Sequence, residues 1–324
     1  MKRQADWAIP ADLQPSAEGR GFDLDAAIEA VVSVRTEVPE DAFTASTLGT
    51  ERAGSGVVVR GDGIVATIGY LLTEAERVWL TTNDGRVVQG HVLGYDQVSG
   101  LGIVQALGKL RVPAMPVGDS TALKAGDPVV VIGEGGRRHS LDASVVAKRE
   151  FAGYWEYVLD EALFTAPAHP QWGGTAVVDA AGRLVGIGSL LVEEKVGRKR
   201  VQGNMSVPAE LLPTLLEDIL AHGRSKAPPR PWLGLYVGEA KEGLVVGGVA
   251  RGGPSERAGL QEGDVLLEVA GGSPTSLASF FRSVWRLGRA GTQVPLKIRR
   301  GGEELHIPVR SGDRNDFLKK PSLH

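Results

Sequence analysis

The sequence predicts a mainly β protein of 324 residues that is divided into two domains. Short strand-like segments alternate with turn signals from Gly54 to about Leu190, as in an antiparallel barrel or sandwich. A helix and a proline-containing linker follow, and a smaller β-rich unit begins at Trp232. The 44 glycines do not recur with the three-residue period of collagen. Their high number therefore indicates many tight turns.

The first domain, expected over residues 23–225, opens with a segment at 23–38 that changes from helical spacing to strand alternation. Strand pairs are then expected within residues 54–67, 77–94, 126–136 and 174–192. Glycine-containing turns at 61–63, 83–85 and 180–182 supply the positive φ that tight hairpins need. A helix is predicted over 206–223, with Ser206 as its N-cap, Pro208 in its first turn and Gly223 at its end.

The remaining segments surround these two units. Residues 1–22 are interpreted as an N-terminal arm, and residues 226–231 as the linker. The second domain is expected over 232–312, with two strands, a turn-rich segment and strand at 253–269, a helix at 276–288 and two final strands. Residues 313–324 are interpreted as a C-terminal tail.

Composition excludes several classes of function. A net charge of −3 gives no footprint for nucleic acid, and the lack of cysteine excludes disulfides and thiol chemistry. No apolar run is long enough for a membrane span, and no secretory signal is present, so the chain as written is expected in the cytoplasm. A signal removed beforehand would place it in the periplasm. The six scattered histidines predict no metal site, and no cofactor is expected.

An ordered series of motifs resembles the HtrA (Deg) family of trypsin-fold serine proteases. In the first domain the motifs are GSGVVVRGDGIVAT, GDSTALKAGDPVVVIGEGG, GGTAVVDAAGRLVGIGSLL and VPAELLPTLLEDILAHG. PWLGLYV, GGPSERAGLQEGDVLLEV and LKIRRGGEELHIPV resemble that family's C-terminal PDZ domain. The resemblance spans about residues 24–310 and implies a trypsin-like double β-barrel followed by a PDZ domain.

The resemblance also locates a Ser-His-Asp triad, and none of its three side chains is present. Tyr70 in GIVATIGYLL stands at the histidine position, Gly100 in YDQVSGLGIV at the aspartate position, and Gly173 in QWGGTA at the serine position. The trypsin-type reaction needs a hydroxyl nucleophile and an imidazole base, so the resemblance implies that this chain cannot perform it. Gln171 also replaces the first glycine of the nucleophile loop, where the oxyanion hole forms.

Two further interpretations concern the former cleft. Thr175 and His169 supply the parts of an alternative hydroxyl–imidazole pair, although such residues are far more often a strand-start threonine and a loop histidine. Aromatic residues are expected to fill the cleft or to line an apolar pocket. They are Tyr70, Trp172, Phe151, Tyr154, Trp155 and Tyr157.

PDZ domains bind an extended C-terminal peptide as an added strand and hold its carboxylate with backbone N–H groups. The resemblance assigns this loop to Trp232, Leu233, Gly234 and Leu235. Leu277, Phe280, Val284 and Leu287 form a stripe that should face the domain core. Phe281 and Trp285 lie on a neighbouring face, where they wall the peptide groove or dock against the other domain or another subunit.

Three functions follow as hypotheses. The first is an inactive protease homologue that binds protein C-termini or unfolded polypeptide and acts as an adaptor, a holdase or a regulator. The second is an active endopeptidase with a non-standard nucleophile such as Thr175, and the third is a structural assembly protein. The resemblance also implies a homotrimer formed through the N-terminal part of the chain, where Trp7 and Phe22 lie.

Overall fold

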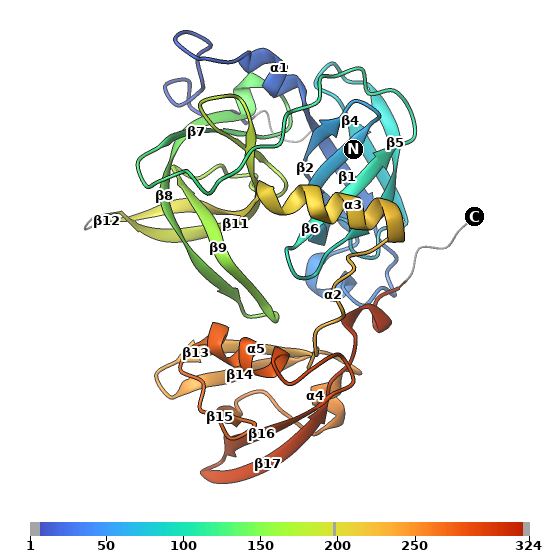
Figure 1. The fold of residues 1–324 in the computed structure, drawn as a ribbon, viewed down its shortest axis with the longest axis vertical. Coiled ribbons are helices and arrows are strands. Elements are labelled where there is room, and N and C mark those ends of the chain that lie inside the picture. Colours follow the sequence, from blue (N-terminus) through green and yellow to red (C-terminus); the bar gives the residue numbers. More distant parts are fainter. Residues whose placement is uncertain (1–6, 197–198, 320–324) are drawn as a thin grey trace. The chain divides into compact units, whose positions relative to one another are not determined.

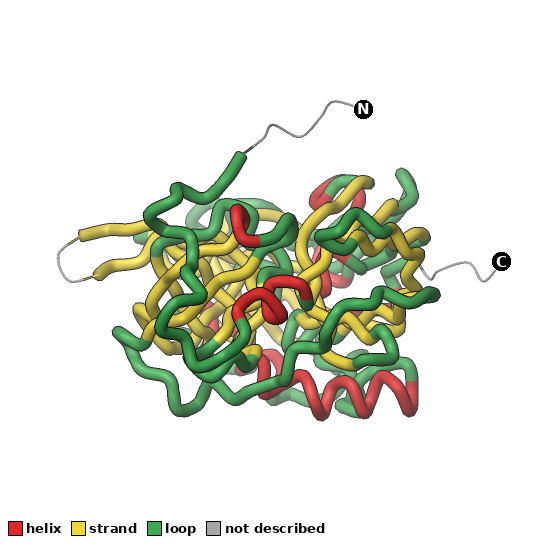
Figure 2. Tube along the Cα trace, turned by 90° about the horizontal axis from the view of Figure 1, so that it is seen from above, coloured by secondary structure: helices red, strands yellow, loops and turns green. Residues whose placement is uncertain are grey.

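A computed structural model describes residues 7–196 and 199–319. The first six residues of the predicted arm and the last five of the predicted tail therefore lie outside the described residues. Strands dominate, and they form two closed six-stranded barrels and one five-stranded sheet (Figure 1). The mainly β prediction is confirmed. The tube in Figure 2, where strands are yellow, shows the same preponderance.

The first barrel has the strand order β1-β2-β3-β6-β5-β4. Its elements are α1 (Leu24–Glu29), β1 (Val31–Glu37), α2 (Ala45–Leu48), β2 (Glu51–Arg60), β3 (Ile64–Ile68), η1 (Gly69–Leu71), β4 (Arg77–Thr81), β5 (Val87–Tyr95) and β6 (Leu101–Ala106). The predicted change from helix to strand within 23–38 is confirmed. Gly63 and Gly85 have φ of 89° and 87°, as the predicted hairpin turns require.

The second barrel has the strand order β10-β11-β12-β9-β8-β7. Its elements are β7 (Pro128–Ile132), η2 (Arg137–His139), β8 (Ser140–Gly153), β9 (Tyr157–Ala166), β10 (Ala176–Val178), β11 (Leu184–Val196) and β12 (Lys199–Pro208). The segment interpreted as an arm takes part in this barrel. Ile9 is buried in its core, Trp7 and Leu13 pack against that core, and the Ile9 N–H donates to the carbonyl of Arg138 at 2.9 Å.

The helix predicted over 206–223 begins later than expected. Ser206 lies inside β12, paired with Leu163 of β9 and Gly188 of β11, so it is not an N-cap. Pro208 ends that strand opposite Gly186. A 3₁₀ turn, η3 (Ala209–Leu211), then leads into α3 (Leu212–His222). Pairing on both sides of β12 is worth more than a cap and holds these residues in the sheet. The end at Gly223 is confirmed by its left-handed φ of 69°.

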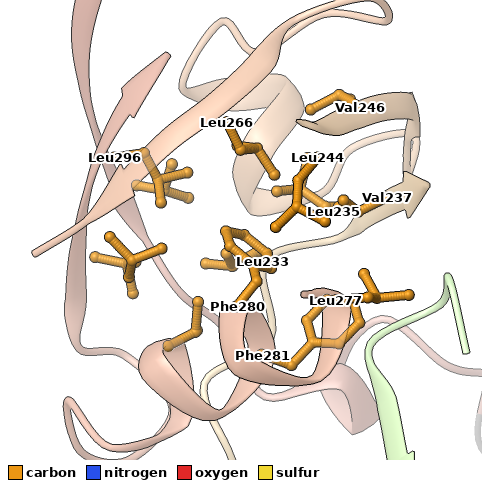
Figure 3. Close-up of a cluster of buried hydrophobic side chains, with 14 of the residues drawn as sticks. Leu233, Leu235, Val237, Leu244, Val246, Leu266, Leu277, Phe280, Phe281 and Leu296 are labelled. Carbon is orange, nitrogen blue, oxygen red and sulfur yellow. The ribbon is translucent and has the colours of Figure 1, made fainter. Parts of the chain in front are cut away.

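The PDZ domain is a five-stranded sheet, β13 to β17 in sequence order, with two helices. Its elements are β13 (Leu235–Ala240), β14 (Gly243–Val249), α4 (Pro254–Arg257), β15 (Val265–Val269), α5 (Leu277–Trp285), β16 (Gln293–Arg300), β17 (Glu303–Arg310) and η4 (Arg314–Asp316). Ser276 caps α5 and forms a capping box with Ser279. The predicted core stripe is confirmed for Leu277, Phe280 and Val284, which are buried. Leu277 and Phe280 are seen among the sheet side chains in Figure 3.

The chain divides into two compact units that differ from a simple cut of the sequence. One holds both barrels. The other holds residues 226–319 together with residues 150–160, which form the tip of the β8–β9 hairpin. We call residues 150–160 the hairpin tip. Its Val158 is buried in the same hydrophobic cluster as the PDZ residues Leu233 and Phe281, so the tip belongs physically to the PDZ unit.

None of the helices among residues 7–196 and 199–319 is long and apolar enough to cross a membrane.

Candidate active-site region and carboxylate-binding loop

The three positions predicted to correspond to the triad, Tyr70, Gly100 and Gly173, lie in the barrel unit. Tyr70 lies in η1, directly after β3, and the N–H of its neighbour Gly69 donates to the carbonyl of Gly100 at 2.6 Å. Gly173 lies in the loop before β10, and its carbonyl accepts from the N–H of Ser55 on β2 at 2.8 Å. The fold therefore brings together the residues that stand at the predicted triad positions.

Tyr70 occupies the space that a nucleophile would need. A Cβ added to Gly173 would lie 2.6 Å from the Tyr70 hydroxyl oxygen, well inside contact distance. That hydroxyl donates to the carbonyl of Ser189 at 3.2 Å. Burial raises the pKa of Tyr70 well above its usual value, against the opposing effect of a hydrogen bond with Trp172. A phenol that stays protonated at neutral pH cannot act as the general base.

The former aspartate position has become a turn. Gly100 has a φ of 79°, in the left-handed region where glycine is favoured, and its N–H donates to the Asp96 carbonyl at 2.8 Å. The Asp96 carboxylate accepts from the Ser99 N–H at 2.7 Å. The Asp96 side chain thus caps this turn. An aspartate in place of Gly100 would have a strained, left-handed backbone conformation.

The N–H of Gln171, an expected donor of the oxyanion hole, forms a hydrogen bond within the protein. The N–H of Gln171 donates to Nδ1 of His169 at 3.2 Å, and Nε2 of the same ring donates to the His139 carbonyl at 2.9 Å. His169 is fully buried, with the ring of Trp7 edge-on at 5.7 Å. Burial is the main cause that lowers its pKa, so the imidazole stays neutral and serves as a structural link.

The structure does not bring Thr175 and His169 together as a hydroxyl–imidazole pair. The Thr175 hydroxyl is buried and donates to the carbonyl of Trp172 at 3.1 Å. Both nitrogens of His169 are engaged with backbone groups, as described above. This arrangement fits the structural interpretation of both residues, in which each satisfies its own loop.

The predicted filling of the cleft holds for Tyr70 and not for the aromatic run at 150–164. Phe151, Tyr154, Trp155 and Tyr157 pack on one another in the hairpin tip, with the rings of Trp155 and Tyr157 stacked at 5.6 Å. These residues belong to the PDZ unit. Their high density reflects rings that pack on one another within the tip, where Tyr157 is buried and Tyr154 is 54% exposed.

The carboxylate-binding loop predicted at 232–235 holds a carboxylate in this structure, and its source is the hairpin tip. The side chain of Glu156 accepts from three consecutive N–H groups, those of Leu233, Gly234 and Leu235. The closest contacts are 3.0, 2.6 and 3.0 Å respectively. Gly234 has a φ of 72°, which turns these N–H groups toward one point. Successive backbone donors of this kind form an anion-binding concavity.

Glu156 was missed by sequence reasoning. It is 9% exposed and has a φ of 62°, uncommon for a residue with a side chain. Burial raises its pKa to about 7, while the three N–H groups and the charge of Arg314 act in the opposite direction. The one sequence signal was an acidic residue within an aromatic run, which by itself does not indicate a contact 77 residues away.

The residues that flank the loop pack into the PDZ unit. Phe281 is fully buried, edge-on to Phe280 and stacked on Trp285 at 5.9 Å, in the same hydrophobic cluster as Val158 of the hairpin tip. Its role as a wall of the peptide groove stays a prediction. Trp285 is partly buried beneath the guanidinium of Arg230 at 4.4 Å. Trp232 is buried against Phe317, whose segment was interpreted as a tail.

Comparison with known proteins agrees with this geometry. Residues 54–187 match the family model of a trypsin-like peptidase domain, and residues 231–310 match that of a PDZ domain. The fold and these two matches describe a chain with a trypsin-like peptidase domain followed by a PDZ domain.

The similar curated proteins are named as DegP-like or HtrA serine proteases. The chain is 24% identical over 279 residues to a probable periplasmic DegP-like serine endoprotease of Halomonas elongata, covering 82% of this chain and 57% of that protein. It is also 24% identical to a Do-like HtrA serine protease of Lactobacillus helveticus, covering 81% and 69%. The chain thus spans just over half the length of the DegP-like relatives it matches.

Solved structures share the fold. The HtrA-type protease AlgW with a decapeptide superposes with a TM-score of 0.54 at 22% identity, over 92% of this chain and 99% of that one. A serine endoprotease from Yersinia pestis gives 0.51 at 22% identity, over 90% and 98%. The predicted architecture of a trypsin-like double barrel followed by a PDZ domain is confirmed.

Proposed function

We propose that this chain is a proteolytically inactive HtrA-type protein that binds C-termini or unfolded segments of other proteins. One observation carries the inactivity: Gly173 has no side chain, and the Tyr70 hydroxyl lies where a nucleophile would begin. The engagement of the Gln171 N–H with His169 supports it, because an oxyanion hole needs its donors directed at the reacting carbonyl.

Peptide binding is supported by the PDZ half. Three backbone donors converge on one carboxylate in the loop at 233–235, which is the chemistry that captures a C-terminus. AlgW, a similar structure, is described with a decapeptide bound. The chain would then hold polypeptide as an adaptor, a holdase or a regulator of active relatives. The names of the DegP-like relatives support the periplasm rather than the cytoplasm as its compartment.

The proposal is tested by incubating the purified chain with an unfolded protein substrate, beside a Thr175→Ala variant and an active HtrA-type protease as positive control. We expect no cleavage by the chain or by its variant. Cleavage by the parent that disappears in Thr175→Ala would instead establish a relocated nucleophile and overturn the proposal. Cleavage that persists in both would also overturn it and would place the reaction elsewhere in the chain.

A further inference from the structure

The loop that would capture a partner's C-terminus already holds a carboxylate from the same chain. The two oxygens of Glu156 receive the N–H groups of Leu233, Gly234 and Leu235, and the residue is buried in the PDZ unit. A free C-terminal carboxylate would use the same three donors, because they converge at one point. The two ligands therefore exclude each other.

The residues before Glu156 extend this mimicry along the edge of the sheet. The carbonyl of Tyr154 accepts from the N–H of Val237 on β13 at 3.0 Å. Tyr154 lies two residues before the carboxylate-bearing residue, and Val237 lies two residues after the last donor of the loop. An extended peptide that adds to a sheet edge forms main-chain bonds at this alternating spacing. The hairpin tip thus reproduces both the end and the strand of a bound peptide.

Apolar and ionic contacts also hold the hairpin tip in the PDZ unit. Val158 is buried in the PDZ core beside Leu233 and Phe281, where a peptide ligand would insert an apolar side chain. Arg282 on α5 forms ion pairs with Glu150 and Asp160, the two ends of the hairpin tip. The tip is therefore held by a carboxylate, a strand-type bond, an apolar anchor and a charged clamp.

We propose that the hairpin tip is an internal ligand of the PDZ domain, with Glu156 in place of a terminal carboxylate, and that it keeps the loop closed to C-termini. This inference rests on the proposed peptide-binding function and adds its regulation. The contacts of the hairpin tip indicate the class of partner. It is a peptide with a free terminal carboxylate, an apolar last side chain and a segment able to add to β13. Such a peptide must displace Glu156 before it binds.

The test measures peptide affinity on the full chain. The probe is a fluorescein-labelled decapeptide ending in Tyr-Trp-Val with a free carboxylate, which imitates Tyr154, Trp155 and the anchor Val158, and its amidated form is the negative control. Wild type is compared with Glu156→Ala and Glu156→Gln. Glu161→Gln is the matched control, because Glu161 lies on β9, half-exposed, and pairs with Lys148 at 3.2 Å.

We expect Glu156→Ala to bind the free-carboxylate probe about 10- to 100-fold more tightly than wild type, as when the competent state is populated at 1–10%. Glu156→Gln should gain less affinity than Glu156→Ala, because its amide keeps one acceptor oxygen for the three donors. The Glu161→Gln control should match wild type, and the amidated probe should bind none of the chains. Hydrogen exchange at the amides of Leu233, Gly234 and Leu235 should quicken in Glu156→Ala.

Equal affinity of wild type and Glu156→Ala for the probe, with unchanged exchange at the three amides, would overturn the internal ligand and leave peptide binding standing. Faster exchange in Glu156→Ala without probe binding by any variant would have the opposite meaning. It would support Glu156 as the ligand of the loop and overturn peptide binding as the proposed function.

Discussion

The Tyr70 hydroxyl occupies the space that a side chain at position 173 would fill. The tyrosine hydroxyl reaches within 2.6 Å of the point where a Cβ at position 173 would stand, and it is anchored there by the carbonyl of Ser189. A side chain at position 173 is therefore unfavourable while tyrosine stands at position 70. We expect the effects of changing these two residues to be coupled.

This coupling is measurable with a double-mutant cycle. Gly173→Ala alone should lower the free energy of unfolding by about 1–3 kcal/mol, because the added methyl group collides with the Tyr70 hydroxyl. In a Tyr70→Phe background, which removes that oxygen, the same change should cost less by more than about 0.5 kcal/mol. Urea unfolding of the four chains gives the coupling energy. Additive effects would show that the two residues do not share space.

The protonation of Glu156 predicts a pH dependence of the closed tip. Its pKa is raised from 4.5 to about 7, so between these values the closed tip holds a proton that an open, solvated tip does not. Closure is therefore strongest at low pH, weakens as pH rises toward 7, and changes little above it. The guanidinium of Arg314 opposes the shift and keeps its charge throughout this range.

Affinity for the free-carboxylate decapeptide should accordingly rise between pH 5 and pH 8 by roughly one to two orders of magnitude. Fluorescence anisotropy across this range measures the change, and Glu156→Gln, which does not titrate, should show a flat profile. A slope that persists in Glu156→Gln would assign the pH dependence to another group.

At the scale of the elements, the backbone of the loop before β10 bears on the proposed inactivity. Restoring Tyr70→His, Gly100→Asp and Gly173→Ser together should give little cleavage of an unfolded substrate. Position 100 has a φ of 79°, and the Gln171 N–H remains engaged with His169. Adding Gln171→Gly is the matched comparison. Robust cleavage by the triple variant would show that the oxyanion donors are available after all.

The carboxylate-binding loop depends on the backbone of Gly234. A Cβ there would lie 3.2 Å from both Ala250 and the Trp232 ring at a φ of 72°. In a Glu156→Ala background, Gly234→Ala should therefore weaken peptide binding by about tenfold or more, in line with a loss of well-aligned hydrogen bonds to a charge. Gly238→Ala, on the following strand β13 with open space around it, is the control and should bind normally. Equal binding by both variants would remove the loop assignment.

For the whole molecule, the homotrimer implied by the resemblance stays a prediction. Light scattering should give three times the chain mass of 34.2 kDa for the full chain. Removal of residues 1–22 tests the role of the arm, and it also removes Ile9 from the second barrel's core. Trp7→Ala is therefore the cleaner variant. An unchanged mass in both would count against the arm as the trimer contact.

Much of the architecture could be predicted because local patterns encode it. Glycine-containing turns located the hairpins, and the alignment of framed motifs located Tyr70, Gly100 and Gly173. The errors arose where distant packing decides. Ser206 has the chemistry of a helix cap, but the strands on either side of β12 pair with it. The contact between Glu156 and the loop at 233–235 joins segments 77 residues apart, which no local pattern reports.

The burial of Val158 in the PDZ core has a consequence for how this chain tolerates change. A fragment cut at the linker, residues 226–319, would lack the hairpin tip and would leave both an apolar gap and three uncompensated backbone donors. Such a fragment would recruit C-termini that the intact chain turns away. Insertions or deletions in the β8–β9 hairpin should in turn alter what the PDZ domain accepts, so the two segments are expected to have diverged as a pair.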